Sequence, residues 1–162
     1  MRTAIIGNAG SGKSTLATAI SGAARIAVLD LDTIFWARDA VAVPRPHESV
    51  MRDLHEFCAE HPEWVIEGCY GRLIEAVLDY QPHLLFLHPG RETCLANCRA
   101  RPWERHKYRS KAEQDTQLDT LLAWVSSYYD RDDHMSLQGH QAIFDGYQGP
   151  KQLLTRLPRL AR

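Results

Sequence analysis

The feature that most constrains the fold of this 162-residue chain is a glycine-rich stretch near its start. It runs from Gly7 to Thr15, reads GNAGSGKST, and fits the phosphate-binding pattern G-x-x-x-x-G-K-[S/T]. The apolar run 3–6 before it predicts a buried strand, and the apolar residues after it recur at helical spacing. Strand, loop and helix thus follow in the order that a phosphate loop requires, which argues against a chance match in a glycine–serine turn.

Each part of this loop has an expected role. The glycines let the backbone curl until its N–H groups point at phosphate oxygens, and the positive end of the next helix adds to that field. Lys13 is expected to reach the β- and γ-phosphates and Ser14 to bind Mg²⁺, so ATP and Mg²⁺ are the expected ligands. The predicted nucleotide-binding residues are Gly7, Asn8, Ala9, Gly10, Ser11, Gly12, Lys13, Ser14 and Thr15.

Composition favours one compact α/β domain over residues 1–162, with 44% apolar residues and a formal net charge of −1. This balance gives no overall basic field for nucleic acid, and no apolar run approaches the roughly 18 residues of a membrane span. No signal-peptide pattern is present, and the four cysteines form no C-x-x-C pair, which predicts buried or half-buried thiols. We expect a cytoplasmic protein, monomeric or homodimeric, with a small-molecule partner and no membrane partner.

Acidic residues follow two predicted strands. The strand 25–29 leads to Asp30 and Asp32, and the strand 64–68 contains Glu67 near its end. Because ligands in open parallel sheets lie beyond the carboxyl ends of strands, these acids are expected beside the phosphate loop. Ser14, Asp30 and Glu67 are predicted to serve Mg²⁺, and Asp32 to take a proton from the acceptor, with the exchange of roles between the two aspartates as the alternative. The structural alternatives are that Asp32 caps a short helix and Glu67 ends a strand at a turn.

The acceptor is expected to bind in an insertion at about residues 32–62. Trp36 places aromatic bulk near Asp32, as suits a small-molecule pocket, and Arg72 either contacts the acceptor or lies in solvent. A hydroxyl acceptor would use Asp32 as a base. A phosphate acceptor would need no base and would depend more on an arginine such as Arg38, Arg45 or Arg72.

A basic cluster lies within the predicted lid at about residues 99–114. Its members are Arg99, Arg101, Arg105, Lys107, Arg109 and Lys111, with Glu104 the only acid among them. Arg101 and Arg105 are expected to act catalytically, by stabilising charge on the transferred phosphoryl group. The alternatives are a solvated basic surface or a nucleic-acid patch, and the second is disfavoured because the cluster is short and the chain slightly acidic.

The C-terminal part predicts a long amphipathic helix over about 113–130, a fifth strand over 140–144 and a last helix over 151–157. The turn 145–150 would then follow the fifth strand and line the adenine site. The fourth strand is expected over 82–88.

Taken together, these segments resemble the P-loop nucleotide-kinase-like family, which includes adenylate kinase and shikimate kinase. The likeness is strongest to the group described as DNA-topology-modulation or adenylate-kinase-related proteins, through the segments 7–15, 31–36, 64–70 and 84–89 and the arginines that follow. The resemblance implies a three-layer α/β/α fold with five parallel strands in the order 2-3-1-4-5. The three-glycine run of shikimate kinases is absent after Ile66, so shikimate is not the expected acceptor.

Two functions follow from this reading. The first is an ATP- and Mg²⁺-dependent kinase that phosphorylates a small hydroxyl- or phosphate-bearing metabolite. The alternative is a nucleotide-binding regulatory protein with little turnover, with or without nucleic-acid contact through residues 99–111. Acceptor-stimulated ADP release distinguishes the first from the second.

Overall fold

The computed structural model describes residues 1–105 and 107–159. Its centre is a five-stranded parallel sheet in the order β2-β3-β1-β4-β5, which confirms the predicted strand order. The strands are β1 (Arg2–Gly7), β2 (Ala27–Asp30), β3 (Trp64–Gly68), β4 (His83–Leu87) and β5 (Lys151–Leu154). The phosphate loop leaves β1, so it lies at the centre of the sheet.

The central strands are apolar because both of their faces are covered. Successive β1 side chains point to opposite faces, so Ala4 and Ile6 enter one core and Ile5 enters the other. All five residues of β3 are buried, including Glu67 at its carboxyl end. A buried carboxylate in such a strand is costly without partners, which marks that end as a polar site.

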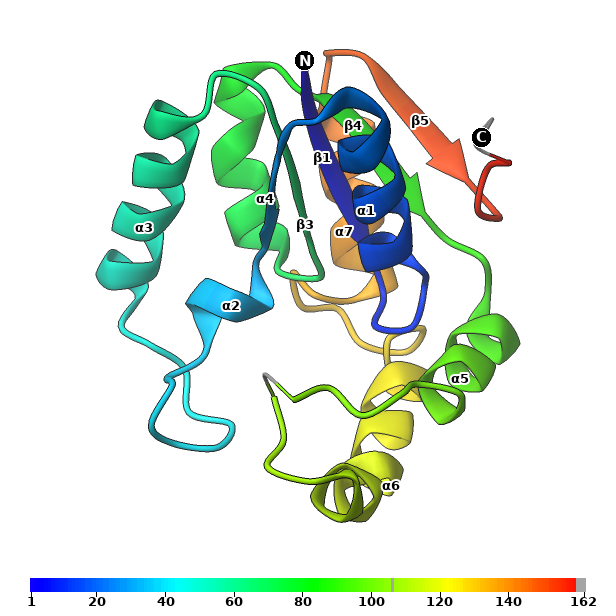
Figure 1. Ribbon diagram of the computed structural model, residues 1–162. Helices are drawn as coiled ribbons and strands as arrows, with labels where there is room; N and C mark the ends of the chain where they lie inside the picture. Colours follow the sequence, from blue (N-terminus) through cyan, green and yellow to red (C-terminus); the bar gives the residue numbers. More distant parts are fainter. Residues whose placement is uncertain (106, 160–162) are drawn as a thin grey trace.

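Helices cover both faces of the sheet. On one face α1 (Lys13–Ala24) packs through Leu16 against Ile5, and the opposite face carries α3 (His47–Glu60), α4 (Gly71–Val77) and α7 (Leu137–Gly146) (Figure 1). The larger core lies on this second face and includes Leu54, Ile74 and Phe86. A short helix, α2 (Asp32–Phe35), follows β2, and a 3₁₀ turn, η1 (Leu78–Tyr80), follows α4.

Two helices stand apart from the sheet. α5 (Arg91–Arg99) and α6 (Lys111–Ser127) pack on each other below the phosphate loop in Figure 1, around Cys94, Cys98 and Val125. α6 begins where Ser110 caps it, because the Ser110 Oγ accepts a hydrogen bond from the Glu113 N–H at 3.0 Å. The loop 100–110 between these helices is the segment that the sequence predicted as a lid.

The predicted fifth strand over 140–144 is wrong, because these residues belong to helix α7. Ser136 caps this helix by accepting from the Gly139 N–H at 3.1 Å, and Ile143 and Phe144 pack on the sheet at helical rather than alternating spacing. The predicted last helix over 151–157 is also wrong. Its first residues form the edge strand β5 instead, which pairs with β4.

Because β5 replaces the predicted last helix, the turn 145–150 does not lie where the sequence predicted an adenine contact. The Leu84 N–H donates to Pro150 O at 2.9 Å, so the turn 145–150 lies at the amino end of β5, away from the phosphate loop. The chain after β5 lies beside that loop instead. A Cβ placed on Gly12 would be 3.2 Å from the Leu157 side chain.

The four cysteines are free thiols and are buried or half-buried as predicted: Cys58, Cys94 and Cys98 are buried, and Cys69 is half-buried. Burial raises the pKa of Cys58 to about 11. Within the described part of the chain, no helix is both long and apolar enough to cross a membrane.

Candidate functional site

The phosphate loop depends on glycine at positions where no other residue fits. Gly10 and Gly12 adopt φ values of 77° and 99°, which L side chains rarely adopt. A Cβ on Gly10 would come within 2.3 Å of the Cys94 carbonyl oxygen, and one on Gly7 within 2.5 Å of the Leu87 carbonyl oxygen. The backbone of the loop is therefore packed directly against its supports, which leaves its conformation little freedom.

Helices α5 and α6 hold the loop from the other side. The buried Asn8 side chain donates to the Val125 carbonyl oxygen at 3.0 Å, at the end of α6. The Asn97 side chain on α5 donates to the Gly10 carbonyl oxygen at 2.8 Å. The loop 100–110 and the phosphate loop are therefore connected through the same helix pair.

Two polar side chains in the loop fit a phosphate ligand. The Lys13 side chain is 8% exposed, and its ammonium donates to the Asn8 carbonyl oxygen at 2.8 Å. The Ser11 hydroxyl is buried and has no hydrogen-bond partner among the described residues. A buried ammonium held by a single carbonyl and an unpaired hydroxyl are groups that phosphate oxygens would satisfy.

Ser14, Glu67 and Asp30, which the sequence predicted as the Mg²⁺ residues, lie close together. The Ser14 hydroxyl donates to Glu67 Oε1 at 2.5 Å, and Asp30 lies directly opposite Glu67 in the β2–β3 register. One hydroxyl and one or two carboxylates suit Mg²⁺, which keeps waters and takes its other ligands from substrate phosphates. No group of three or more His, Cys, Asp or Glu side chains in the described ranges could hold an ion by itself.

Burial weakens the acids of this ion site. It raises the pKa of Glu67 above its usual value, which the Lys13 charge partly offsets and the Asp30 charge reinforces. Burial also raises the pKa of Asp30, and the neighbouring Asp32 charge adds to it. A cation bound between these carboxylates would relieve that repulsion, so their chemistry fits the predicted ion.

Asp32 stands at the centre of a network that reaches across the fold. Its Oδ1 accepts from the Tyr70 hydroxyl, and its Oδ2 forms an ion pair with the Lys107 ammonium at 2.7 Å. The Trp36 indole N–H donates to the same Tyr70 hydroxyl at 2.8 Å, and Phe35 stacks on the Tyr70 ring. The network joins α2, the start of α4 and the loop 100–110.

The neighbours of Asp32 and Lys107 determine the charge of each side chain. Burial disfavours the charged form of Asp32, but the Lys107 ammonium and the Tyr70 hydroxyl outweigh it and hold the pKa of Asp32 below its usual value. Burial likewise opposes the charge of Lys107, but Asp32 and then Glu104 raise its pKa above the usual value. Both groups are therefore charged at neutral pH.

The predicted arginines lie around this network and not at its centre. Arg101 pairs with Glu104 at 3.6 Å, and the Arg105 guanidinium lies over the Trp103 ring. Arg72 is exposed in the first turn of α4. The pKa of His134 is lowered mainly by the burial of that histidine and secondly by the charge of Arg72. The structure thus brings Lys13, Ser14, Asp30, Asp32, Trp36 and Glu67 to one edge of the sheet and leaves Arg72, Arg101 and Arg105 in other contacts.

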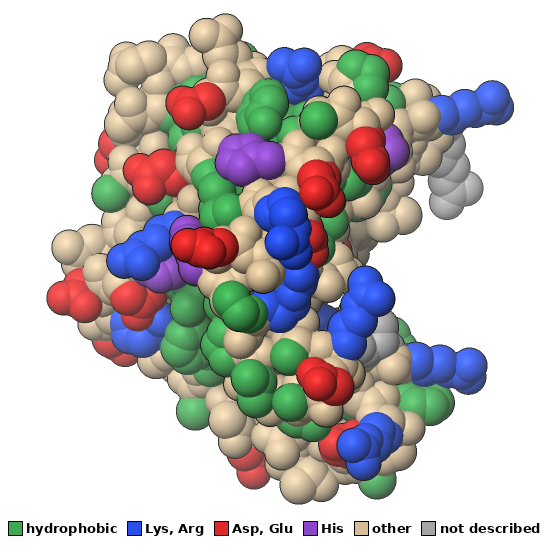
Figure 2. All heavy atoms as spheres, turned by 90° about the vertical axis from the view of Figure 1, so that its left-hand side faces the viewer, with side chains coloured by type: hydrophobic (Ala, Val, Ile, Leu, Met, Phe, Trp, Pro, Cys, Tyr) green, Lys and Arg blue, Asp and Glu red, His purple; other side chains and the backbone are tan. Residues whose placement is uncertain are grey.

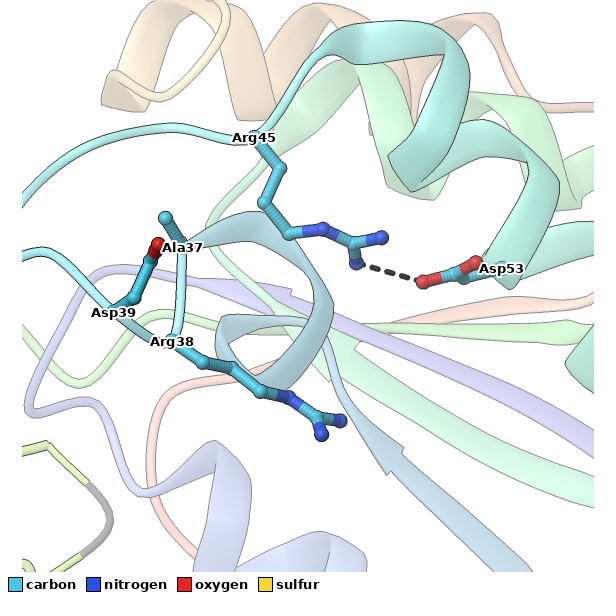
Figure 3. A pocket seen from close by; sticks show the side chains of 5 residues that line it. All are labelled: Ala37, Arg38, Asp39, Arg45 and Asp53. Atoms are coloured by element: carbon cyan, nitrogen blue, oxygen red, sulfur yellow. Dashed lines mark hydrogen bonds and ion pairs between the residues drawn. The ribbon is translucent and has the colours of Figure 1, made fainter.

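The molecular surface is hollowed beside this edge, and Lys and Arg side chains gather along the rim (Figure 2). One cavity, of about 280 Å³, lies in the predicted acceptor insertion and is lined by Ala37, Arg38, Asp39, Arg45 and Asp53. Figure 3 shows Arg45 paired with Asp53 at 2.7 Å, while Arg38 extends separately beneath α2. None of its lining residues belongs to the phosphate loop, so this cavity adjoins the candidate site without containing it.

Sequence reasoning missed two members of the site. Tyr70 was part of the family-like segment 64–70 but was given no role, and Lys107 was one of several lid cations. Position alone gave a signal for Tyr70, since it follows β3 by two residues at the same edge as Glu67. Nothing in the sequence singled out Lys107 from its basic neighbours.

Comparison with known proteins supports the fold. No protein-family model and no curated protein matches this sequence. A shikimate kinase from Bacteroides thetaiotaomicron aligns over 97% of this chain and 86% of its own, at 17% identity and a TM-score of 0.54. The YorR protein from Bacillus subtilis, solved with phosphorylated GDP, aligns over 94% of this chain and 84% of its own, at 10% identity and a TM-score of 0.51.

The architecture that these comparisons define is the P-loop kinase fold. The strand order and the succession of β1, loop and α1 belong to it.

Proposed function

We propose that the protein is an ATP- and Mg²⁺-dependent phosphotransferase that acts on a small metabolite. The observation that carries the proposal is the meeting of three groups at one edge of the sheet: Lys13 in the phosphate loop, the Ser14–Glu67 pair, and Asp32 held by Tyr70. A triphosphate-binding loop alone would serve many functions. A positioned carboxylate beside it is what transfer to a hydroxyl group requires.

In the proposed reaction the acceptor oxygen attacks the γ-phosphorus of ATP. The new O–P bond forms as the bond to the β,γ-bridging oxygen breaks, ADP leaves with that electron pair, and the acceptor proton passes to Asp32. Lys13 would hold the β- and γ-phosphate oxygens and balance the charge that develops there. Mg²⁺, bound near Ser14, Glu67 and Asp30, would neutralise phosphate charge.

Asp32 fits the role of base because its carboxylate is oriented before any ligand arrives. The chain of hydrogen bonds from the Trp36 indole to the Tyr70 hydroxyl to Asp32 Oδ1 fixes one oxygen. Phosphoryl transfer is catalysed mainly by positioning and charge stabilisation, so a fixed carboxylate suits a hydroxyl acceptor. The carboxylates of Asp30 and Glu67 near Asp32 also make this end unfavourable for a phosphate acceptor.

Within the kinase fold we place the chain in the DNA-topology-modulation or adenylate-kinase-related group. In support, the segments that carry the likeness meet in the structure, because Asp32 and Trp36 from one bond with Tyr70 from the other. The four free thiols suit a reducing compartment, so the proposed site of action is the cytoplasm, with ATP at hand.

A direct test is a screen for ADP release with Mg²⁺-ATP over nucleosides, nucleoside monophosphates, sugar acids and small alcohols. We expect at least one hydroxyl compound to stimulate release, and Asp32→Asn to reduce the stimulated rate by about 10²–10⁴-fold, as for a lost general base. Asp119→Asn, an exposed change on α6, is the matched control. Stimulated release that is equal in wild type and Asp32→Asn would remove Asp32 from the reaction.

One observation favours the alternative of a regulatory nucleotide-binding protein with a nucleic-acid surface. Trp103 is 36% exposed with the Arg105 guanidinium 5.0 Å from its ring centroid, a combination that binds single strands elsewhere. The remaining cluster argues against it, because Lys107 and Arg101 are engaged with acids of the protein itself. Salt-sensitive binding of single-stranded DNA without acceptor-stimulated turnover would favour this alternative.

A further inference from the structure

The described residues of the loop 100–110 are held by contacts with one another and with α6. Buried Gln114 on α6 accepts from the Glu104 N–H at 2.8 Å and donates to the Pro102 carbonyl oxygen at 3.1 Å. The Trp103 indole donates to the Tyr108 carbonyl oxygen at 3.0 Å. These bonds fix the backbone on both sides of Lys107, at residues 102–104 and at Tyr108.

One side chain connects this unit to the acceptor side of the site. Lys107 reaches Asp32 at 2.7 Å, and it is the only side chain from the described residues of this loop with a polar contact to the segment between β2 and β3. Lys107 is held in place from behind by Glu104 at 3.6 Å, which in turn pairs with Arg101. The ammonium is therefore directed at Asp32 by the loop itself.

The contact has a consequence for chemistry at Asp32. The Tyr70 hydroxyl already bonds to one oxygen of this carboxylate, and the Lys107 ammonium covers the other. Each carboxylate oxygen keeps a second lone pair, so the two contacts do not fill Asp32 completely. The ammonium at Oδ2 nevertheless stabilises the carboxylate, which makes Asp32 a weaker base for as long as the ion pair is in place.

We propose that Lys107 is a positioning residue that keeps Asp32 occupied until an acceptor hydroxyl replaces it, and that this exchange suppresses transfer to water. The inference rests on the proposed kinase function. Water could otherwise attack the γ-phosphorus: its oxygen would bond to phosphorus, the bond to the β,γ-bridging oxygen would break, ADP would leave, and the water proton would pass to Asp32.

The exposure of the pair suits such an exchange. The two side chains are 26% and 28% exposed, so solvent screens their attraction and the pair is far weaker than a fully buried one. An acceptor that binds beside Asp32 through several contacts can supply the binding energy to displace the ammonium, whereas a single water has little to supply. The released ammonium is then free to meet the phosphate charge that Lys13 also faces.

The first experiment measures the contact without any reaction. Amide hydrogen exchange of residues 100–105 and 107–110 is followed in the ligand-free wild type, Lys107→Met, Asp32→Asn and the control Lys111→Met, whose ammonium pairs with Asp115 on α6. We expect exchange to rise roughly fivefold in Lys107→Met and Asp32→Asn, the ratio that one screened ion pair gives. Exchange unchanged in both variants would overturn the inference.

The second experiment measures ADP release with Mg²⁺-ATP and no acceptor. Lys107→Met is expected to raise this rate by about threefold to tenfold over wild type, because loss of one screened pair uncovers Asp32. Lys111→Met should match wild type, and Lys107→Met with Asp32→Asn should return to the wild-type rate or below. A rate in Lys107→Met at or below that of wild type would overturn the inference.

The outcomes separate this inference from the proposed function. Acceptor-stimulated turnover in wild type, combined with unchanged exchange in the variants, would overturn the role of Lys107 and leave the kinase function standing. The opposite result is faster amide exchange in Lys107→Met and Asp32→Asn, together with no ADP release from any of the proteins in the presence or absence of candidate acceptors. That result would overturn the kinase function and, with it, the proposed suppression of hydrolysis.

Discussion

At the scale of single residues, Tyr70 carries more of the site than its position suggests. Its hydroxyl accepts from the Trp36 indole at 2.8 Å and donates to Asp32, so one oxygen atom orients two side chains from α2 and its end. The ring itself is 3% exposed and stacks on Phe35. Its hydroxyl can therefore be removed without disturbing the packing of the ring.

We expect Tyr70→Phe to lower acceptor phosphorylation by about tenfold to a hundredfold, because a charge-assisted hydrogen bond that positions the base is lost. The free energy of unfolding should fall by only about 1–3 kcal/mol. Steady-state kinetics and urea unfolding measure the two effects. The control Tyr80→Phe removes a hydroxyl that meets exposed His55, and should change neither quantity greatly. An equal loss of turnover in both variants would contradict the role of Tyr70.

His140 is a second residue whose chemistry follows from burial. It is fully buried, its Nε2 donates to the Cys69 carbonyl oxygen at 2.8 Å, and its Nδ1 therefore accepts from the Tyr128 hydroxyl at 2.9 Å. This arrangement needs a neutral ring. Burial lowers the pKa of His140 to about 4, although the hydrogen bond to the Cys69 carbonyl oxygen acts in the opposite direction and raises it.

The unfolded chain titrates this histidine near its ordinary pKa of about 6.5, so between pH 6.5 and 4 it binds more protons than the folded chain. Stability from His140 is therefore complete above pH 6.5 and is lost as pH falls toward 4, by roughly 2–3 kcal/mol. Urea unfolding measures the free energy of unfolding of wild type and His140→Gln at pH 7.5 and 4.5. The difference in free energy between the two proteins should be smaller at pH 4.5 by this amount. A constant difference would contradict a neutral His140.

What the sequence predicted at this scale depended on local rules. Lys13 and Ser14 follow from a contiguous motif, and Asp30, Asp32 and Glu67 follow from the rule that parallel strands present their carboxyl ends at one edge. The Lys107–Asp32 contact joins residues from distant parts of the chain through α5 and the loop after it. The geometry of this contact depends on how α5 and α6 pack on each other, and no spacing in the sequence predicts that packing.

At the scale of elements, helix α6 sets the shape of the loop that precedes it. Gln114 is 9% exposed and binds two backbone groups of that loop, which otherwise would need water or other partners. The stability of the loop therefore depends on one side chain of a neighbouring helix.

Gln114→Ala should loosen the loop while leaving the sheet intact, because two backbone groups lose their partner at a cost of about 1–3 kcal/mol. Trypsin should then cleave after Arg105, Lys107 or Arg109 several-fold faster, without a matching loss of secondary structure by circular dichroism. The control Gln117→Ala changes an exposed glutamine on the same helix. Identical cleavage rates in the two variants would contradict an ordering role for Gln114.

The element that sequence reasoning placed wrongly shows where local pattern fails. The run His140–Phe144 is short and apolar, and such a run suits a buried strand or a buried helix equally well. The capping serine at Ser136 favoured the helix, as the structure has it. β5 carries almost no pattern of its own, since three of its four residues are exposed, and only its pairing with β4 defines it.

At the scale of the whole molecule, the fold assembles the site from segments spread over the chain. The phosphate loop contacts β4, α5 and α6 as well as the chain after β5, through Gly7, Gly10, Asn8 and Gly12. A ligand bound in that loop would therefore bear on most of the structure. Stabilisation by nucleotide should appear in global unfolding and not only near the loop.

Mg²⁺-ATP at a hundred times its dissociation constant should add about 2.7 kcal/mol to the free energy of unfolding, because it binds the folded state alone. For a domain of this size that corresponds to a rise in melting temperature of roughly 5–10 °C. Lys13→Ala should abolish most of the rise, since Lys13 is the buried cation of the loop, while its own melting temperature without ligand stays near that of wild type. Lys111→Ala, an exposed lysine on α6, should keep the full rise. Calorimetric scans of the three proteins with and without Mg²⁺-ATP make the comparison, and an undiminished rise in a folded Lys13→Ala protein would place nucleotide binding elsewhere than in the phosphate loop.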